Sequence, residues 1–129
     1  EQVESLGGRF LTVEGAEGVK VEGGYAKEVS AEYLEKQQQL IRDKIKDADL
    51  VITTALVMGK KSPILVTEEM VKSMKMGSVI VDMAVESGGN CALSEKNKTI
   101  VKHGVTLVGE SNLPSLLPVN ASNLYATNI

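Results

Sequence analysis

The sequence is poor in the residues that carry most side-chain chemistry. It contains one cysteine (Cys91), one histidine (His103) and no tryptophan, and only 3% of its residues are aromatic. A single cysteine forms no internal disulfide, which fits a reducing compartment, and a histidine without other ligand types clustered beside it predicts no metal site. No apolar run approaches the roughly 20 residues that cross a bilayer, and no signal peptide opens the chain. We therefore expect no metal centre, no disulfide framework and no transmembrane segment.

An excess of positive charge is missing too. Lysine and arginine together number 14 against 17 aspartate and glutamate residues, which gives a formal net charge of −3. Nucleic-acid-binding domains present a basic patch, and the charges here are mixed along the chain, so we expect no nucleic-acid partner. What the sequence does have is a hydrophobic content of 43% over 129 residues. That is enough for one domain with a core of aliphatic side chains.

Helical and strand-like patterns alternate along the chain. Ser30 is a plausible N-cap for a helix from about Ala31 to Lys46, and Thr67 caps a second helix whose core side carries methionine and valine. Alternation of this kind predicts a parallel sheet with crossover connections and flanking helices, a Rossmann-like α/β fold. We predict a loop over Glu110–Pro118 and the start of a C-terminal helix over residues 119–129. The predicted strands are Arg9–Val13, Asp49–Thr53, Ser78–Met83, Thr99–Lys102 and Val105–Gly109, the last two joined by a turn at His103-Gly104.

The stretch Ser78–Asn90 is the part around which we expect the chain to be organised. Its apolar run Val79–Val81 predicts a strand covered on both faces, Asp82 ends the run, and Gly88-Gly89-Asn90 closes the segment that follows. Ligands of open α/β sheets bind beyond the carboxyl ends of the strands, and paired glycines let a flat ligand or a phosphate approach the backbone. A strand followed by a tight turn explains the same residues, and this stretch alone favours that interpretation over a ligand site.

A neighbouring strand end offers a second wall for such a crevice. Thr54, Ala55 and Leu56 follow the buried strand predicted over Asp49–Thr53, in the same structural position as Ala84–Asn90 after the next strand. The carboxyl ends of adjacent parallel strands meet at one edge of the sheet. We therefore expect these two segments to form one wall of a ligand crevice together.

A long glycine-rich loop over residues 14–29 is the next candidate feature. Gly23, Gly24, Tyr25 and Lys27 stand at its far end, and loops of this length in compact domains are typically lids, binding loops or disordered segments. A surface loop without a function is one interpretation. The aromatic residue beside two glycines favours a lid that closes over a ligand.

Gln37 is a polar residue on the apolar face of the helix that starts near Ala31. It falls between Tyr33 or Leu40 and Ile41 in the helical pattern, whereas Gln38 lies nearer the edge of the apolar stripe. A buried amide needs a hydrogen-bond partner. Gln37 is therefore either a ligand contact or an amide bonded to nearby backbone, and the pattern does not separate the two.

The glycine-rich fingerprint of dinucleotide binding is absent. No G-x-G-x-x-G occurs in the sequence, so the βαβ unit that would hold a pyrophosphate at a helix start is missing. Glu1–Leu6 has the pattern of a helix end. We therefore expect an incomplete Rossmann-like fold, a piece of a longer protein whose first βαβ unit lies outside these residues.

Several segments resemble one protein family. GGYAKE at Gly23–Glu28, ITTALVMGK at Ile52–Lys60 and LVTEEMVKSMKMGSVIVDMAVESGGN at Leu65–Asn90 resemble the NAD(H)-binding component of proton-translocating NAD(P) transhydrogenase. KHGVTLVGESNLPS at Lys102–Ser115 and ASNLYATNI at Ala121–Ile129 continue the similarity, which covers essentially the whole chain. The combination of a GGYAKE lid with TTAL and VESGGN is specific to that family.

The resemblance implies an activity that needs partners. The enzymes of this family move hydride directly between NADH and NADP⁺ and couple the transfer to proton passage through a membrane component. The NAD(H)-binding component is a homodimer, peripheral to the membrane on the bacterial cytoplasmic or mitochondrial matrix side, and it docks against an NADP(H)-binding component. Direct transfer between two cofactors requires alignment and exclusion of water rather than a protein acid or base. It therefore implies no catalytic residue in this chain.

The same resemblance implies the contact residues for NAD(H). Gly24 and Tyr25 correspond to the mobile lid, and Gln37 to a contact on the helix. A further wall corresponds to Ala84 and Glu86. Thr54, Ala55 and Leu56 complete the set of implied NAD(H) contacts. The family's nicotinamide-positioning residues precede the segment matched here and correspond to no residue of this chain.

Three positions depart from the family pattern, and one related family is a rival. Met58 and Met76 stand where proline is usual, and Leu116 replaces an arginine common after Pro-Ser. Alanine dehydrogenase shares the architecture and an acidic residue before paired glycines, but it normally lacks the GGYAKE lid, so transhydrogenase is preferred. A third interpretation is a non-catalytic nucleotide-binding fragment.

Overall fold

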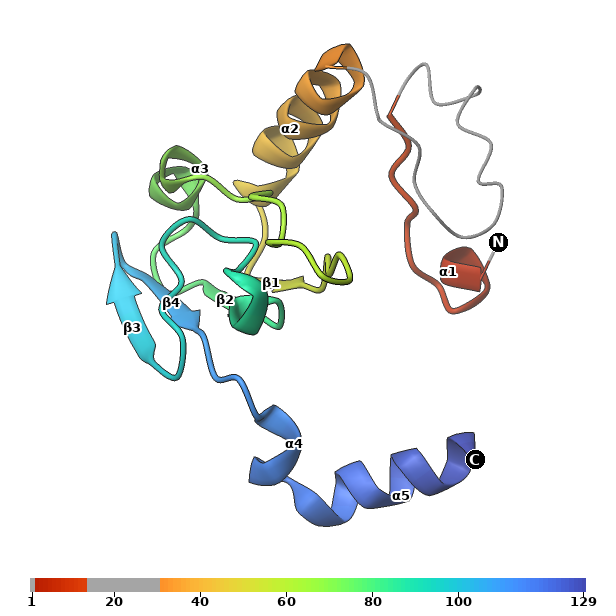
Figure 1. Cartoon of the computed structure of the whole chain (residues 1–129). Helices are drawn as coiled ribbons and strands as arrows, with labels where there is room; N and C mark the ends of the chain where they lie inside the picture. Colours follow the sequence, from red (N-terminus) through yellow and green to blue (C-terminus); the bar gives the residue numbers. More distant parts are fainter. Residues whose placement is uncertain (1, 14–30) are drawn as a thin grey trace. The chain divides into compact units, whose positions relative to one another are not determined.

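The computed structural model describes residues 2–13 and 31–129 and divides the chain into two compact units, Glu1–Asp43 and Lys44–Ile129 (Figure 1). The predicted lid over residues 14–29, with Gly24 and Tyr25, lies outside the described residues. Each unit is a separate body with its own internal contacts.

Helices supply the regular structure described in the first unit. Helix α1 (Gln2–Ser5) ends at Gly7, whose φ of 81° suits a glycine and whose N–H donates to the carbonyl of Glu4 over 2.9 Å. Helix α2 (Ala31–Ile45) confirms the long helix predicted from the sequence. The strand predicted over Arg9–Val13 is wrong, because those residues form neither helix nor strand. A β-run needs a partner strand for its hydrogen bonds, and the described part of this unit contains no strand.

The second unit is built on a four-stranded sheet in the order β1-β2-β4-β3. Strands β1 (Leu50–Thr53), β2 (Val79–Asp82) and β4 (Val105–Val108) are mutually parallel, and β3 (Thr99–Lys102) pairs antiparallel with β4. The expected Rossmann-like α/β fold is therefore present, with a mixed rather than a purely parallel sheet. The antiparallel strand belongs to the crossover from β2 to β4, which carries the 3₁₀ turn η2 (Val85–Ser87) and β3 instead of an α-helix.

Local sequence signals explain the turns of this unit. Helix α3 (Glu68–Ser73) begins at Thr67, whose hydroxyl accepts the N–H of Met70. His103 and Gly104 join β3 to β4 with φ values of 54° and 75°, and positive φ at both central residues is typical of a type I′ hairpin turn. Glycine at the second position adopts this conformation without strain.

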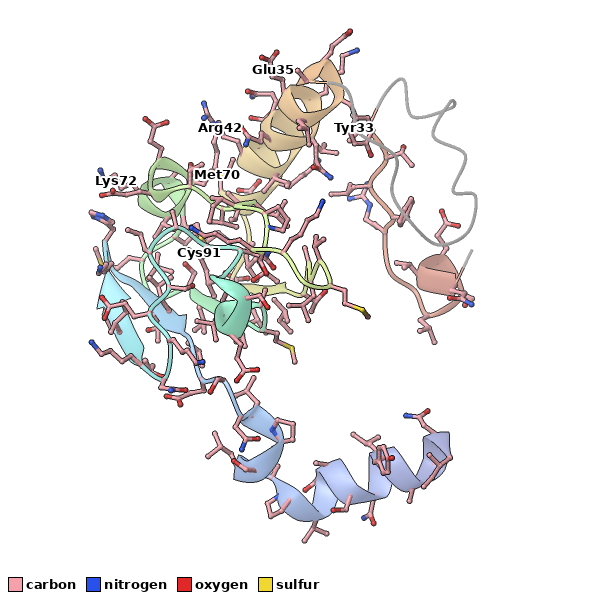
Figure 2. The ribbon with its side chains drawn as sticks, in the orientation of Figure 1. Tyr33, Glu35, Arg42, Met70, Lys72 and Cys91 are labelled. Carbon is pink, nitrogen blue, oxygen red and sulfur yellow. The ribbon has the colours of Figure 1, made fainter. Side chains whose placement is uncertain are left out.

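The buried core lies on one face of the sheet. Residues paired in register point to the same face, so Ile80 and Leu107 share a face; both are buried, as are Met70 and Val71 of α3. Figure 2 shows Met70 and Lys72 on opposite sides of α3, as two residues spaced by about 200° on a helix must lie. The remaining apolar core residues of this unit are Ile45, Val66, Met74, Ala84, Val85, Cys91 and Val105.

The other face of the sheet, which we call the open face, is largely uncovered. Leu50 and Ile52 of β1 are 58% and 57% exposed, and Val101 of β3 is 67% exposed. The prediction of a buried strand at β1 is therefore wrong for this unit. The central strand β2 is buried on the core face and half-buried on this face, at Val79 and Val81. The apolar runs are present, but within residues 44–129 no layer of helices covers this face. The open face consists of Leu50, Ile52, Val79, Val81, Thr99, Val101, Thr106 and Val108.

The C-terminal segment is more helical than the sequence indicates. Helix α4 (Leu113–Leu116) lies inside the stretch predicted as a loop, with Pro114 in its first turn. Helix α5 (Pro118–Asn128) then confirms the predicted C-terminal helix, again with proline at its start. None of the helices in residues 2–13 and 31–129 has the length and apolar character needed to cross a membrane.

Candidate functional site

The carboxyl ends of β1 and β2 meet at one edge of the sheet. Thr53 is paired in register with Asp82, and the N–H of Met83 donates to the carbonyl of Thr53 over 2.9 Å. The segments that follow, Thr54–Leu56 and Ala84–Glu86, therefore leave neighbouring strands from the same edge. This is the place at which open α/β sheets bind ligands.

Asp82 ties the chain together at this edge. Its side chain is fully buried, and one oxygen, Oδ1, accepts the hydroxyl of Thr53 and the N–H of Ala84, both over 3.1 Å. The other oxygen, Oδ2, accepts the N–H of Asn90 over 2.9 Å and that of Cys91 over 3.0 Å. Three backbone donors and one hydroxyl satisfy both carboxylate oxygens, so the buried carboxyl is stabilised by hydrogen bonds.

The side-chain amide of Asn90 hydrogen-bonds the segment that follows β1. Oδ1 accepts the N–H of Ala55 over 2.9 Å, and Nδ2 donates to the carbonyls of Ala55 at 3.0 Å and Pro63 at 2.8 Å. Asn90 is fully buried, so these bonds are shielded from competing water. The amide holds the segment after β1 against the segment after β2.

Gly89, the second of two consecutive glycines, makes the close approach to Asp82 possible. Gly88 and Gly89 have φ values of 100° and 80°. A Cβ added to Gly89 would lie 2.8 Å from Oδ2 of Asp82, inside van der Waals contact. In the structure the group that approaches Gly89 is the chain's own carboxylate, so the predicted approach of a ligand to the glycine pair stays a prediction.

The predicted contact residues at this edge differ in their exposure. Thr54, Leu56 and Glu86 are exposed, with Leu56 at 61%, and Ala55 is half-buried. Ala84 is fully buried, and its carbonyl accepts the N–H groups of Ser87 and Gly89. Of the predicted contact residues at this edge, Thr54, Leu56 and Glu86 are therefore open to solvent, whereas Ala84 is not.

Gln37 lies in the first unit and lines a cleft of about 370 Å³. It is half-buried on α2 beside Tyr33, labelled in Figure 2. The sequence placed Gln37 on the apolar side of its helix, and the residues that share the cleft agree with that placement. The other lining residues are Phe10, Leu11, Thr12, Val13, Leu40 and Ile41. The predicted lid residues Gly24 and Tyr25 are not among the described residues, so their role stays a prediction.

The two residue types associated with metals and nucleophiles occupy structural positions. His103 Nε2 lies 3.1 Å from Oε1 of Glu68 at the hairpin turn, and residues 2–13 and 31–129 contain no group of three histidine, cysteine, aspartate or glutamate side chains arranged for a metal ion. Cys91 is buried, and that burial raises the pKa of its thiol. A neutral buried thiol is a poor nucleophile.

Comparison with known proteins gives the family. The profile described as "Alanine dehydrogenase/PNT, C-terminal domain" matches residues 1–129. The chain belongs to this family.

Relatives within the family fall into two groups. The first portion of the NAD(P) transhydrogenase subunit alpha of Rhodospirillum rubrum is 53% identical over 131 residues, which cover 100% of this chain and 34% of the relative. The alanine dehydrogenase of Staphylococcus haemolyticus is 45% identical over 83 residues, covering 60% of this chain and 22% of that protein. The chain thus spans about a third of the length of the transhydrogenase subunit it matches, and the resemblance drawn from the sequence motifs is confirmed.

A solved structure in the family has the same fold. The crystal structure of transhydrogenase from Sinorhizobium meliloti superimposes with a TM-score of 0.74 and 44% identity, covering 98% of this chain and 32% of the other. At this level of identity the likeness extends beyond the general α/β architecture.

The departures from the family pattern all fall on exposed positions. Met58 is 94% exposed, Met76 is 89% exposed and Leu116 is 64% exposed. Nothing in the described residues explains the change at Leu116.

Sequence reasoning missed the two residues that hold this edge together. In the sequence Asp82 marks the end of an apolar run and Asn90 the end of a turn, whereas in the structure both are buried and fully bonded. The signal was a polar residue directly after a buried strand, followed eight residues later by an amide next to paired glycines.

Proposed function

We propose that this chain is the second half of the NAD(H)-binding domain in the alpha subunit of a proton-translocating transhydrogenase. The single observation that carries the proposal is the paired edge after β1 and β2, which is hydrogen-bonded to Asp82 and Asn90 and exposes Thr54, Leu56 and Glu86. The whole-length similarity to transhydrogenase subunits supports it.

The residues exposed at this edge suit one side of NAD(H). A threonine hydroxyl and a glutamate carboxylate can bond ribose hydroxyls, and the exposed leucine offers apolar area to a flat base. The edge lacks a glycine-rich helix start for the diphosphate, and the sequence contains none. The fit is therefore to the ribose and base side of the cofactor, with the diphosphate held by residues outside this chain.

In this mechanism the chain positions the cofactor, and none of its residues takes part in the chemical step. NADH, when bound, supplies the hydride that passes directly to NADP⁺, a step that needs alignment and a dry site. Thr54, Leu56 and Glu86 border the cofactor. Asp82 and Asn90 hydrogen-bond the backbone of the two segments that carry these residues, from the buried side. Gly24, Tyr25 and Gln37 are proposed as further contacts, with the first two in a lid.

The partners follow from the same proposal. We assign NADP(H) to a separate NADP(H)-binding component, proton passage to a membrane component, and the NAD(H)-binding component to a homodimer. The chain would then act at the surface of a membrane, on the bacterial cytoplasmic or mitochondrial matrix side. Subunit naming among the relatives supports the existence of partner components.

The experiment uses the full-length parent protein. Its affinity for NADH is measured by calorimetry, and hydride transfer to NADP⁺ is measured after its partner components are added. Leu56→Ala and Glu86→Gln should each weaken NADH binding, whereas Met76→Ala, which alters an exposed methionine at the opposite end of β2, should not. The proposal would be contradicted if all three variants bound NADH with the affinity of the wild type.

A parallel assay separates the second candidate, alanine dehydrogenase, which the 45% identity to such an enzyme favours. L-alanine-dependent reduction of NAD⁺ by the parent protein, without transfer to NADP⁺, would establish that alternative. Binding of NADH with neither activity in the complete assembly would indicate the non-catalytic interpretation.

A further inference from the structure

We propose that Asn90 is a positioning residue of the NAD(H) site, which sets the backbone of Thr54–Leu56 through its side-chain amide before the cofactor arrives. This inference rests on the proposed function, because it assumes that Thr54 and Leu56 contact NAD(H). It adds a residue that does not itself touch the cofactor.

The segment after β1 needs an external support. Residues 54–61 form neither helix nor strand, and the turn bond from the N–H of Lys60 to the carbonyl of Val57 is local and long, at 3.2 Å. A segment without regular structure samples several conformations unless other groups hold it. Ala55 is where another group does hold it, because its N–H and its carbonyl both bond to Asn90.

Asn90 is itself held independently of its side chain. Its N–H donates to Asp82, and its carbonyl accepts the N–H groups of Leu65 and Val66 over 2.8 and 3.0 Å. The amide is therefore a short arm that extends from a fixed backbone to Ala55. Through this contact the end of β2 fixes the backbone on both sides of Ala55, and with it the side chains of Thr54 and Leu56.

The chemistry of the contact requires an asparagine. One oxygen must accept from Ala55, and one nitrogen must donate both to Ala55 and to Pro63. An aspartate of nearly the same shape keeps the acceptor but offers lone pairs to the two carbonyls. Each buried carbonyl left without a donor is destabilising.

The decisive variant is Asn90→Asp in the full-length parent protein. We expect its dissociation constant for NADH to rise roughly tenfold or more, since two buried carbonyls lose their donor. Burial and the neighbouring Asp82 carboxylate raise the pKa of the introduced carboxyl. Lowering the pH then protonates it and restores one donor, so NADH affinity should recover as pH falls in the variant but not in the wild type.

Ser78→Ala is the matched control. Ser78 is a buried residue at the opposite end of β2, where its hydroxyl donates to the carbonyl of Lys75 over 2.7 Å. Its loss should lower the free energy of unfolding without changing NADH affinity or its pH profile. A purely structural role for Asn90 would make the two variants behave alike.

Amide hydrogen exchange tests the same inference without any substitution, which matters if Asn90→Asp does not fold. In the parent protein without NADH, the N–H of Ala55 should exchange slowly, because the contact exists before the cofactor binds. Fast exchange of Ala55 that slows only on addition of NADH would overturn the inference.

The outcomes also separate the inference from the function on which it rests. A wild-type parent protein that binds no NADH overturns both. The positioning role alone is overturned if the wild-type protein binds NADH and the dissociation constant of the Asn90→Asp variant stays within about twofold of the wild-type value at every pH.

Discussion

Single residues in this chain act mainly through the backbone groups that they bind. Asp82 accepts three backbone N–H groups, and Asn90 bonds three backbone groups of two other residues. Both stand at or beyond the end of β2, where the chain has no regular structure to satisfy its polar groups. Buried backbone groups must find partners, and here side chains supply them.

Replacing Gly89 tests how closely the backbone approaches the Asp82 carboxylate. Gly89→Ala places a Cβ 2.8 Å from the Asp82 carboxylate at a φ of 80°, so we expect a loss of about 2 to 4 kcal/mol in the free energy of unfolding. Gly59→Ala is the control, because Gly59 has a φ of 71° but no heavy atom within 4 Å of the added Cβ. It should lose only about 1 kcal/mol. Urea denaturation measures both, and equal losses would contradict the close approach.

Cys91 gives a prediction for alkaline pH. Burial raises the pKa of its thiol, so above the unfolded value of about 8.5 the unfolded chain loses a proton that the folded chain keeps. The stability contributed by the neutral thiol is fully present below that pH and declines as pH rises above it. The difference in unfolding free energy between the wild type and Cys91→Ala should shrink from about pH 8 to about pH 10. A difference that stays constant would argue against a buried neutral thiol.

A short helix or strand forms in this chain where the local sequence favours it and buried contacts with other parts of the chain stabilise it. Helix α3 has only six residues, too few to persist alone. It combines the Thr67 cap and two glutamates near its positive end with the buried side chains of Met70 and Val71.

The cap of α3 can be tested directly. Thr67→Ala removes the acceptor of the Met70 N–H and should lower the free energy of unfolding by about 1 kcal/mol. Thr67→Ser keeps the hydroxyl and should restore most of that loss, which thermal unfolding can measure. Equal destabilisation by the two substitutions would assign the effect to the methyl group rather than to the cap.

Elements with strong local chemistry were predictable, and those that depend on distant partners were not. The bounds of β3 and the His103-Gly104 turn follow from β-branched runs around a residue pair suited to positive φ. The strand expected over residues 9–13 failed because a strand also needs a neighbour, which sequence pattern does not report. The site was predicted to lie at the two strand ends, but the bonds of Asn90 to Ala55 span 35 positions, and no local pattern encodes such a contact.

At the scale of the whole chain, the open face and the outer edge of β1 leave apolar side chains and backbone groups uncovered in residues 44–129. Leu50 and Ile52 are each more than half exposed, and within this sheet β1 is paired on one side only. Exposed apolar strands at a sheet edge promote association. This surface has the character of an interface with residues outside 44–129.

The 129-residue chain by itself should therefore associate and bind NADH weakly. Sedimentation velocity should show mass increasing with concentration, and Ile52→Lys, which charges the open face, should reduce that increase. Calorimetry should give a dissociation constant well above the micromolar range, since no glycine-rich turn holds the diphosphate. Low-micromolar affinity, roughly −8 kcal/mol, would mean that the missing unit is not needed.

The hairpin of β3 and β4 has a consequence for the order in which the sheet assembles. Its two strands are joined by a two-residue turn, and such hairpins close within about 1 to 10 μs. The pairing of β1 with β2 must close a loop between Thr53 and Asp82, which is entropically costlier and slower. The strand pair that leaves the ribosome last is thus the first able to form. During synthesis β1 and β2 emerge before β3 and β4. Their apolar side chains therefore stay exposed until the fastest-forming pair of strands has been made.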